Sequence, residues 1–246
     1  MMKKWLASLG FGSAKVDTRL EDRPFFPGEQ VKGEIVIRGG DADQQIEDIY
    51  LELIAEYLKD GKNVRHICAK YYIARKILIS PHEEKTLPLS IKLPMELPMS
   101  TGRFPIYLRT GLDIKMALDP QDQDRIDVIP KPLVQKILKD IEDAGFVLYS
   151  IVNRYVSGRQ PYPFVQVFEF RPTGRYHGVL DQLHVFFDYT EEEMAVHFEI
   201  YRSGDIISYS FCWKHQKPSE TLRINDQPCQ GDPLLKIQEL LHRKNG

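Results

Sequence analysis

Hydrophobic and polar residues alternate over residues 14–128, in short segments that proline and glycine interrupt. In the segment 31–38, for example, Ile35 and Ile37 share one face, whereas Glu34 and Arg38 share the other. Successive side chains of a β-strand point to opposite faces of its sheet, so this period of two predicts half-buried antiparallel strands. About seven such segments precede residue 130, the number typical of a sandwich of two facing sheets.

Turn residues and one proline add detail to this sandwich. Asp60 and Gly61 separate two alternating segments and predict a β-hairpin between them. Pro88 lies inside a later segment, where it cannot donate a backbone hydrogen bond to a neighbouring strand. We therefore expect the strand that contains Pro88 to lie at the edge of a sheet.

The hydrophobic period changes after Pro130. Over residues 132–144 the apolar positions fall on one face of a helix, with Pro132 suited to its first turn and Gly145 to its end. Alternating segments then resume, and residues 233–243 form a second amphipathic helical pattern. The sequence predicts an all-β protein of two sandwich domains, residues 1–130 and 131–246, with one short helix at the junction and one at the C-terminus.

Composition narrows the class of partner. The 246 residues contain 33 Lys and Arg against 35 Asp and Glu, a net charge of −2, which argues against binding to nucleic acid. The 3 cysteines are far apart in the sequence and form no CxxC pair, which favours a reducing cytoplasm. No segment approaches the roughly 18 uninterrupted apolar residues of a membrane span.

The N-terminal segment 1–12 carries Trp5 and Phe11 behind two lysines. Such a turn can contact a lipid headgroup layer or a protein surface, and we favour a protein surface because so short an apolar face binds membranes weakly. Trp5 and Phe11 are therefore candidate partner-binding residues.

Acidic residues are densest between Asp113 and Asp127. Asp119, Asp122, Asp124 and Asp127 do not follow the spacing of a calcium-binding loop, which also needs a glycine at its sixth position and a glutamate at its twelfth. We predict a solvated, negatively charged loop that serves as a docking surface for a protein partner.

No catalytic or cofactor signature accompanies these patterns. Serine does not occur in a G-x-S-x-G turn, and no glycine-rich phosphate loop follows a strand. His177, His184 and His197 lack the spacing of a metal site, and His184 is expected to face outward. We expect no enzyme activity, no cofactor and no metal.

Several segments resemble the bacterial SpoOM sporulation-control family, in the order in which that family has them. They are TGLDIKMA at residues 110–117, DAGF at 143–146, FEFRPT at 168–173 and GVLD at 178–181. The resemblance spans nearly the whole chain. It implies two stacked β-sandwich domains of arrestin type and a cytosolic regulatory role in sporulation and cell-cycle control, and it brings no catalytic residues.

These observations favour a cytoplasmic adaptor that holds protein partners, through sheet edges, the concavity between its domains or the acidic segment. Sheet edges also offer a route to a homodimer. Two alternatives remain open: a metal- or ligand-binding module that uses the histidines of the second domain, and a peripheral membrane protein anchored by residues 1–12.

Overall fold

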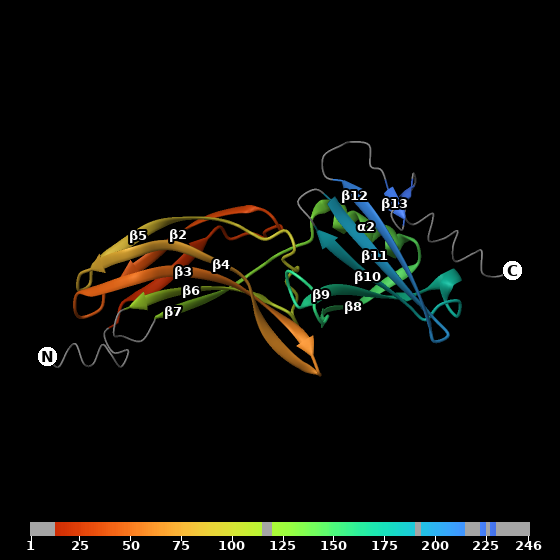
Figure 1. Cartoon of the computed structure of the whole chain (residues 1–246), viewed down its shortest axis with the longest axis horizontal. Coiled ribbons are helices and arrows are strands. Elements are labelled where there is room, and N and C mark those ends of the chain that lie inside the picture. Colours follow the sequence, from red (N-terminus) through yellow and green to blue (C-terminus); the bar gives the residue numbers. More distant parts are fainter. Residues whose placement is uncertain (1–12, 115–119, 190–192, 215–221, 225–226, 230–246) are drawn as a thin grey trace. The chain divides into compact units, whose positions relative to one another are not determined.

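The computed structural model describes residues 13–114, 120–189, 193–214, 222–224 and 227–229 (Figure 1). These residues form β-strands joined by turns, with a single α-helix among them, which confirms the all-β prediction. The chain divides into two compact units. The first comprises Met1–Glu56 and Asn63–Ile129, and the second comprises Tyr57–Lys62 and Pro130–Gly246.

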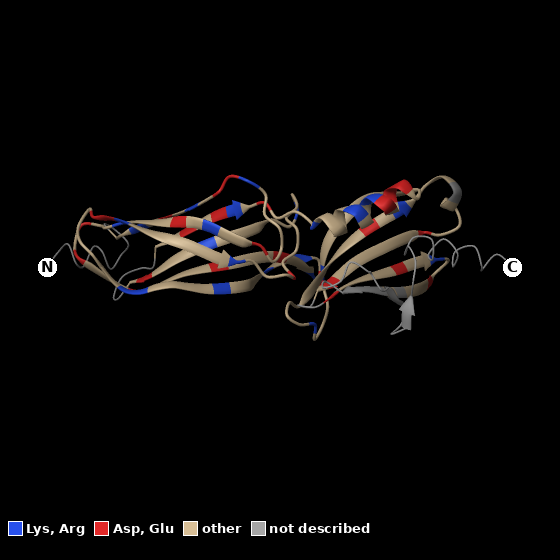
Figure 2. Ribbon diagram, turned by 90° about the horizontal axis from the view of Figure 1, so that it is seen from above, with Lys and Arg blue, Asp and Glu red and all other residues tan. Residues whose placement is uncertain are grey.

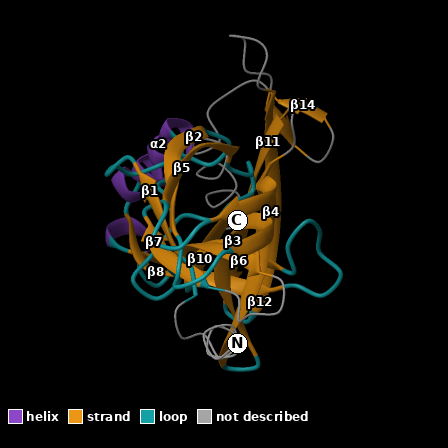
Figure 3. Cartoon of the chain, turned by 90° about the vertical axis from the view of Figure 1, so that its left-hand side faces the viewer, coloured by secondary structure: helices purple, strands orange, loops and turns teal. Residues whose placement is uncertain are grey.

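The first unit consists of two facing antiparallel sheets. One sheet has the order β1-β2-β5, formed by Lys15–Leu20, Gln30–Arg38 and Glu84–Lys92. The other has the order β4-β3-β6-β7, formed by Lys62–Ile79, Gln44–Lys59, Ile106–Ile114 and Gln121–Ile126. In the end-on view of Figure 3, β2 and β5 belong to one layer and β3, β4 and β6 to the other.

Alternating hydrophobic residues of both sheets fill the space between them. Ile35 and Ile37 of β2 are fully buried, as are Leu51 and Leu53 of β3, each with 0% of its surface exposed. Each such side chain contributes about 1.5–3 kcal/mol when it leaves water. The hydrophobic residues that recur at every second position in the sequence are therefore the residues that form the core of this sandwich.

Each sheet of the first unit has an end strand on either side, and the four end strands lie in two pairs, one on each flank of the sandwich. A hydrogen bond between Thr18 and Asp122 brings β1 beside β7 on one flank. On the other flank, the Tyr71 hydroxyl of β4 donates to the Lys92 carbonyl at the end of β5, at 2.6 Å. Pro88 lies in β5, an end strand, as its missing N–H predicts.

The described strands of the second unit follow one hydrogen-bonded order from β8 to β14, with every neighbouring pair antiparallel. Their bounds are Phe146–Tyr155, Phe164–Pro172, Gln182–Tyr189, Glu193–Arg202, Asp205–Lys214, Leu222–Ile224 and Gln227–Cys229. A 3-10 turn, η1, covers Gly174–Tyr176. The tip of the β3–β4 hairpin joins this unit, where Tyr57 stacks on Phe164.

The single described α-helix, α2, covers Pro132–Asp143 and packs against β8. Val134, Ile137 and Ile141 are buried, and the opposite face carries both cations and carboxylates (Figure 2). Gly145 follows the helix with φ of 104°, a conformation that glycine adopts without strain. The helix predicted at residues 233–243 lies outside the described residues, and no described helix has the length and apolar character to cross a membrane.

Candidate functional site

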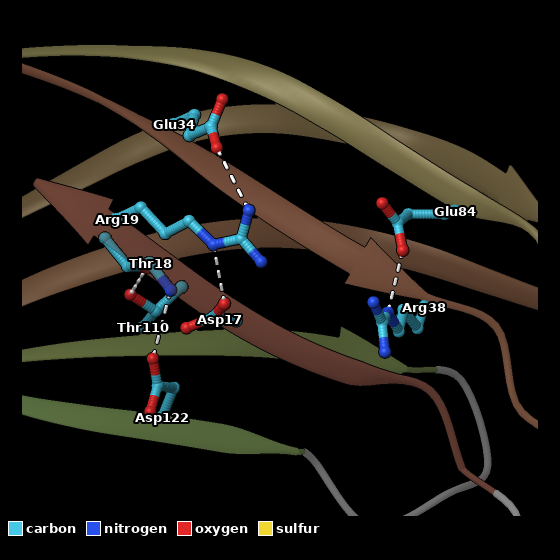
Figure 4. Close-up of polar contacts among 8 residues, drawn as sticks. All are labelled: Asp17, Thr18, Arg19, Glu34, Arg38, Glu84, Thr110 and Asp122. Carbon is cyan, nitrogen blue, oxygen red and sulfur yellow. Dashed lines mark hydrogen bonds and ion pairs between the residues drawn. The ribbon is translucent and has the colours of Figure 1, made fainter.

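The β1–β7 flank is closed by hydrogen bonds between the two sheets. Thr18 of β1 and Thr110 of β6 are both buried, and their hydroxyl oxygens lie 2.6 Å apart (Figure 4). The backbone N–H of Thr18 donates to Oδ2 of Asp122 on β7, at 3.1 Å. An end strand otherwise leaves such an N–H without a strand partner, so Asp122 blocks part of the β1 edge.

Asp124 lies two residues further along β7 and shares the inward side with Asp122. The pKa of Asp124 is raised to about 6, mainly by burial and in addition by the neighbouring carboxylates of Asp122 and Asp17. Asp17 itself accepts from Arg19, which also reaches Glu34 on β2 (Figure 4). Inward-pointing carboxyl groups on an end strand are a known means of preventing that strand from pairing with other chains.

The structure corrects the prediction of a solvated acidic loop. Residues 121–126 form strand β7, and Asp122 and Asp124 are half-buried and turned toward β1. Asp127 follows the strand and is exposed, while its carbonyl accepts from the Phe25 amide at 2.8 Å. Asp119, Trp5 and Phe11, the other predicted partner-binding residues, lie outside the described residues.

The opposite flank presents the outer edge of β4, which we call the β4 edge. β4 pairs only with β3 among the described strands, and it is 18 residues long. Three large hydrophobic side chains are exposed along it: Ile67 at 45%, Tyr72 at 56% and Leu78 at 60%. Exposed cations lie between these three residues along the strand, in the order Arg65, Ile67, Lys70, Tyr72, Arg75, Lys76, Leu78.

The cations of β4 form a charge pattern that runs across the sheet. Glu52 of β3 is only 4% exposed and accepts from Arg109 of β6 on one side. On its other side, Lys70 Nζ lies 2.9 Å from Glu52 Oε1. Burial raises the pKa of Glu52, but the hydrogen bonds from Arg109 and Lys70 outweigh it and hold the pKa below its usual range. Arg109, Glu52 and Lys70 therefore form a row across the sheet, from β6 through β3 to β4, in which a cation, an anion and a cation follow one another.

Two further pairs repeat this pattern between β3 and β4. Arg65 Nε lies 3.2 Å from Glu56 Oε1, and Arg75 Nε lies 3.1 Å from Asp48 Oδ1. The guanidinium of Arg75 also lies 5.2 Å from the ring centre of Tyr72. The pairs leave Arg65 and Arg75 more than half exposed, so both cations remain available to a further anion.

The second unit buries one of the histidines proposed as ligands. His184 is 5% exposed, which contradicts the expectation that it faces outward. Its Nε2 lies 2.9 Å from the Gln182 side-chain oxygen, and its Nδ1 lies 3.4 Å from a guanidinium nitrogen of Arg154. Burial lowers the pKa of His184, so the ring is neutral near pH 7. A cation as close as Arg154 disfavours a metal ion at this ring.

A second histidine joins three adjacent strands. His197 of β11 lies between Ser210 of β12, at 2.7 Å from Nδ1, and Asp188 of β10, at 3.1 Å from Nε2. Arg159 also donates to Asp188. Burial raises the pKa of Asp188, but the nearby His197 ring and the hydrogen bond from Arg159 reverse this and bring it to about 2.

This serine, histidine and aspartate set was missed in the sequence because its members are spread over residues 188–210. Ser210 lies within a regular strand that pairs with β11, whereas an active serine of this kind stands on a turn beside free N–H donors for an oxyanion. The arrangement therefore stabilises the sheet as a row of polar contacts. Among the described residues, no three histidine, cysteine or acidic side chains are grouped so as to hold a metal ion.

Comparison with known proteins agrees with this fold. Residues 2–204 match the SpoOM protein family. The chain is 37% identical over 210 residues to the sporulation-control protein Spo0M of Bacillus subtilis, covering 81% of this chain and 80% of that protein. The crystal structure of Spo0M from Bacillus subtilis superposes with a TM-score of 0.74 at 31% identity, covering 82% of this chain and 91% of that one. The chain therefore belongs to the SpoOM family of sporulation-control proteins.

Proposed function

We propose that this protein is a cytoplasmic regulatory adaptor in sporulation and cell-cycle control, which acts by holding protein partners and catalyses no reaction. Membership of a sporulation-control family supports the regulatory role. The mode of action is supported chiefly by the β4 edge, where a long end strand exposes both cations and large hydrophobic side chains.

Exposed hydrophobic residues on an end strand are a liability that proteins usually remove. In the first unit, the other end strands carry features that limit pairing, such as Pro88 in β5 and the Thr18 to Asp122 hydrogen bond between β1 and β7. An edge that keeps Ile67, Tyr72 and Leu78 exposed is therefore best explained by contact with another protein.

Crosslinking in cells followed by mass spectrometry tests the proposal. The full chain and a Tyr72→Asp/Leu78→Asp variant are expressed at equal levels in a sporulating bacterium that lacks its own copy. We expect crosslinks to protein partners from the β3–β4 region, loss of these crosslinks in the variant, and a sporulation defect in the same cells.

The matched control is Val147→Asp/Ile206→Asp, which introduces the same two charges at residues of the second unit that are 52% and 57% exposed. It is expected to retain the crosslinks and the normal sporulation frequency. Unchanged crosslinks and unchanged sporulation in the Tyr72→Asp/Leu78→Asp variant would rule out the β4 edge as the contact surface.

A further inference from the structure

Four end strands of the first unit are candidates for pairing with another chain, and three of them are hindered. β1 has one backbone N–H occupied by Asp122, and β7 directs Asp122 and Asp124 inward. β5 contains Pro88, which offers no N–H. β4 differs because it is the longest strand of the unit, and its hindrances lie near its C-terminal end: Lys76 has φ of 54°, and Lys85 of β5 donates a hydrogen bond to the Leu78 carbonyl. Pairing is therefore best accommodated on the N-terminal side of Lys76.

The charge row across the sheet indicates which side chains an added strand needs. Arg109, Glu52 and Lys70 alternate in sign from β6 through β3 to β4. Side chains directly opposite each other on neighbouring strands interact, and like charges there are destabilising. The next position in the row, beyond Lys70, is therefore suited to a carboxylate.

Arg65 and Arg75 extend this requirement along the strand. Each already pairs with an acidic residue of β3 on one side, and their side chains are 55% and 67% exposed. Between these cations, Ile67 and Tyr72 offer apolar contacts. The three cations and the two apolar residues all lie on the exposed face of β4. The matching extended segment therefore carries acidic and apolar residues in turn at every second position, on one of its own faces, while backbone hydrogen bonds supply affinity and side chains supply selectivity.

A second copy of this chain is a poor occupant of the same edge. β4 contains five lysine or arginine residues and no acidic residue. Antiparallel pairing of β4 with its own copy would set these cations against one another, which disfavours a homodimer through this edge. The charge balance therefore selects a different segment, one that carries the opposite sign.

We propose that the β4 edge binds an extended acidic segment of a partner protein by adding it to the sheet as a further strand. This inference rests on the proposed adaptor function and specifies the chemistry of the partner. The segment pairs with β4 in the stretch from Arg65 to Arg75, with its carboxylates beside the cations and its apolar residues against Ile67 and Tyr72.

Fluorescence anisotropy with the full chain and a labelled peptide tests the inference. The probe is a short synthetic peptide that repeats glutamate, threonine, valine and threonine, so that glutamate and valine share one face of a strand. Its counterpart has lysine in place of glutamate. We expect the glutamate peptide to bind in a salt-dependent manner and the lysine peptide to bind at least about tenfold more weakly. Equal binding of the two peptides, or no binding of the glutamate peptide, would overturn the inference.

Charge reversal locates the site. Arg65→Glu/Arg75→Glu is expected to weaken binding of the glutamate peptide about tenfold or more and to strengthen binding of the lysine peptide. Arg38→Glu is the control, because Arg38 is a similarly exposed cation of β2 that also pairs with a carboxylate, Glu84. It is expected to leave both affinities unchanged. If the reversed variant does not fold, Arg65→Gln/Arg75→Gln is used, with loss of glutamate-peptide binding expected and unchanged binding counting against the site.

A third peptide separates strand addition from simple charge attraction. Methylation of alternate backbone nitrogens on its pairing side removes the donors of a sheet but keeps every charge. We expect this peptide to lose binding, and retained binding would overturn strand addition. If the glutamate peptide fails while crosslinks in cells still depend on Tyr72 and Leu78, the adaptor function stands and only the acidic partner is wrong; loss of both results refutes both proposals.

Discussion

The two flanks of the first unit differ in how their side chains treat the unpaired edges of the end strands. On the β1–β7 flank, polar side chains point inward and join the sheets, as Thr18 does with Thr110 and Asp122. On the opposite flank, the Tyr71 hydroxyl of β4 joins the sheets through the Lys92 carbonyl, whereas the cations of β4 lie on the surface, where Lys70 reaches across to Glu52 of β3. The Thr18 to Asp122 contact occupies a backbone N–H of an end strand, whereas Tyr71 and Lys70 use only their side chains.

This difference shows how one sandwich can occupy the groups of one strand edge with inward carboxyl groups and line another with surface cations. An inward carboxyl group loses part of its hydration, and this loss raises the pKa of Asp124 to about 6. In return, such a group prevents the strand edge from pairing with another chain. Surface cations cost little and preserve access. The four predictions below test whether stability depends on the interior contacts of each flank while the exposed side chains of β4 remain free for function.

Among the polar contacts, the largest effect on stability is expected at Glu52, where the charge row that reaches β4 is buried. Glu52→Gln keeps the shape of the side chain but removes the charge that Arg109 and Lys70 share. We expect a loss of about 2 kcal/mol in the free energy of unfolding, because two cations then face a neutral group. Urea denaturation measures it. Glu84→Gln, at a side chain that is 51% exposed, is the control and is expected to change stability by less than about 0.5 kcal/mol.

On the β1–β7 flank, the pair of threonines provides a double-mutant test. Thr110→Val removes one hydroxyl and leaves that of Thr18 buried without its partner, at a cost of about 1–2 kcal/mol. Thr18→Val/Thr110→Val replaces both hydroxyls by methyl groups and is expected to recover most of this loss. The same urea denaturation applies, and additive losses in the double variant would show that the two hydroxyls do not interact.

Asp124 makes the stability of the same flank depend on pH. Its pKa is raised to about 6, so the folded state holds a proton that the unfolded state releases near pH 4. The folded state therefore loses stability as the pH rises from about 4 to 6. Asp124→Asn removes this loss, and because the carboxyl is partly exposed we expect a gain of about 1 kcal/mol at pH 7.

Urea denaturation of both proteins at pH 4.5 and pH 7 checks the effect of Asp124. The two stabilities are expected to converge at the lower pH. A gain in Asp124→Asn that is the same at both pH values would mean that the proton on Asp124 is not its cause.

The sequence could predict the strands whose hydrophobic residues alternate, such as β2 with Ile35 and Ile37. It did not predict β7, because QDQDRI has no apolar alternation and forms a strand by pairing with β6. The polar sites depend on register, which aligns Glu52 with Arg109 and His197 with Ser210. No local pattern reports such pairs. The absence of acidic residues in 62–79 was visible, but only the topology identifies this segment as an end strand.

The smallest effect on stability is expected at the exposed residues of β4 itself. Leu78 is 60% exposed, whereas its neighbour Ile79 is 0% exposed. Leu78→Ser therefore removes little buried surface and is expected to change the free energy of unfolding by less than about 0.5 kcal/mol, while Ile79→Ser opens a polar cavity in the core and costs about 3 kcal/mol or more. Thermal and urea denaturation compare them. If Leu78→Ser is as damaging as Ile79→Ser, Leu78 belongs to the core; if Leu78→Ser leaves stability intact, the leucine is retained for a contact outside the folded unit.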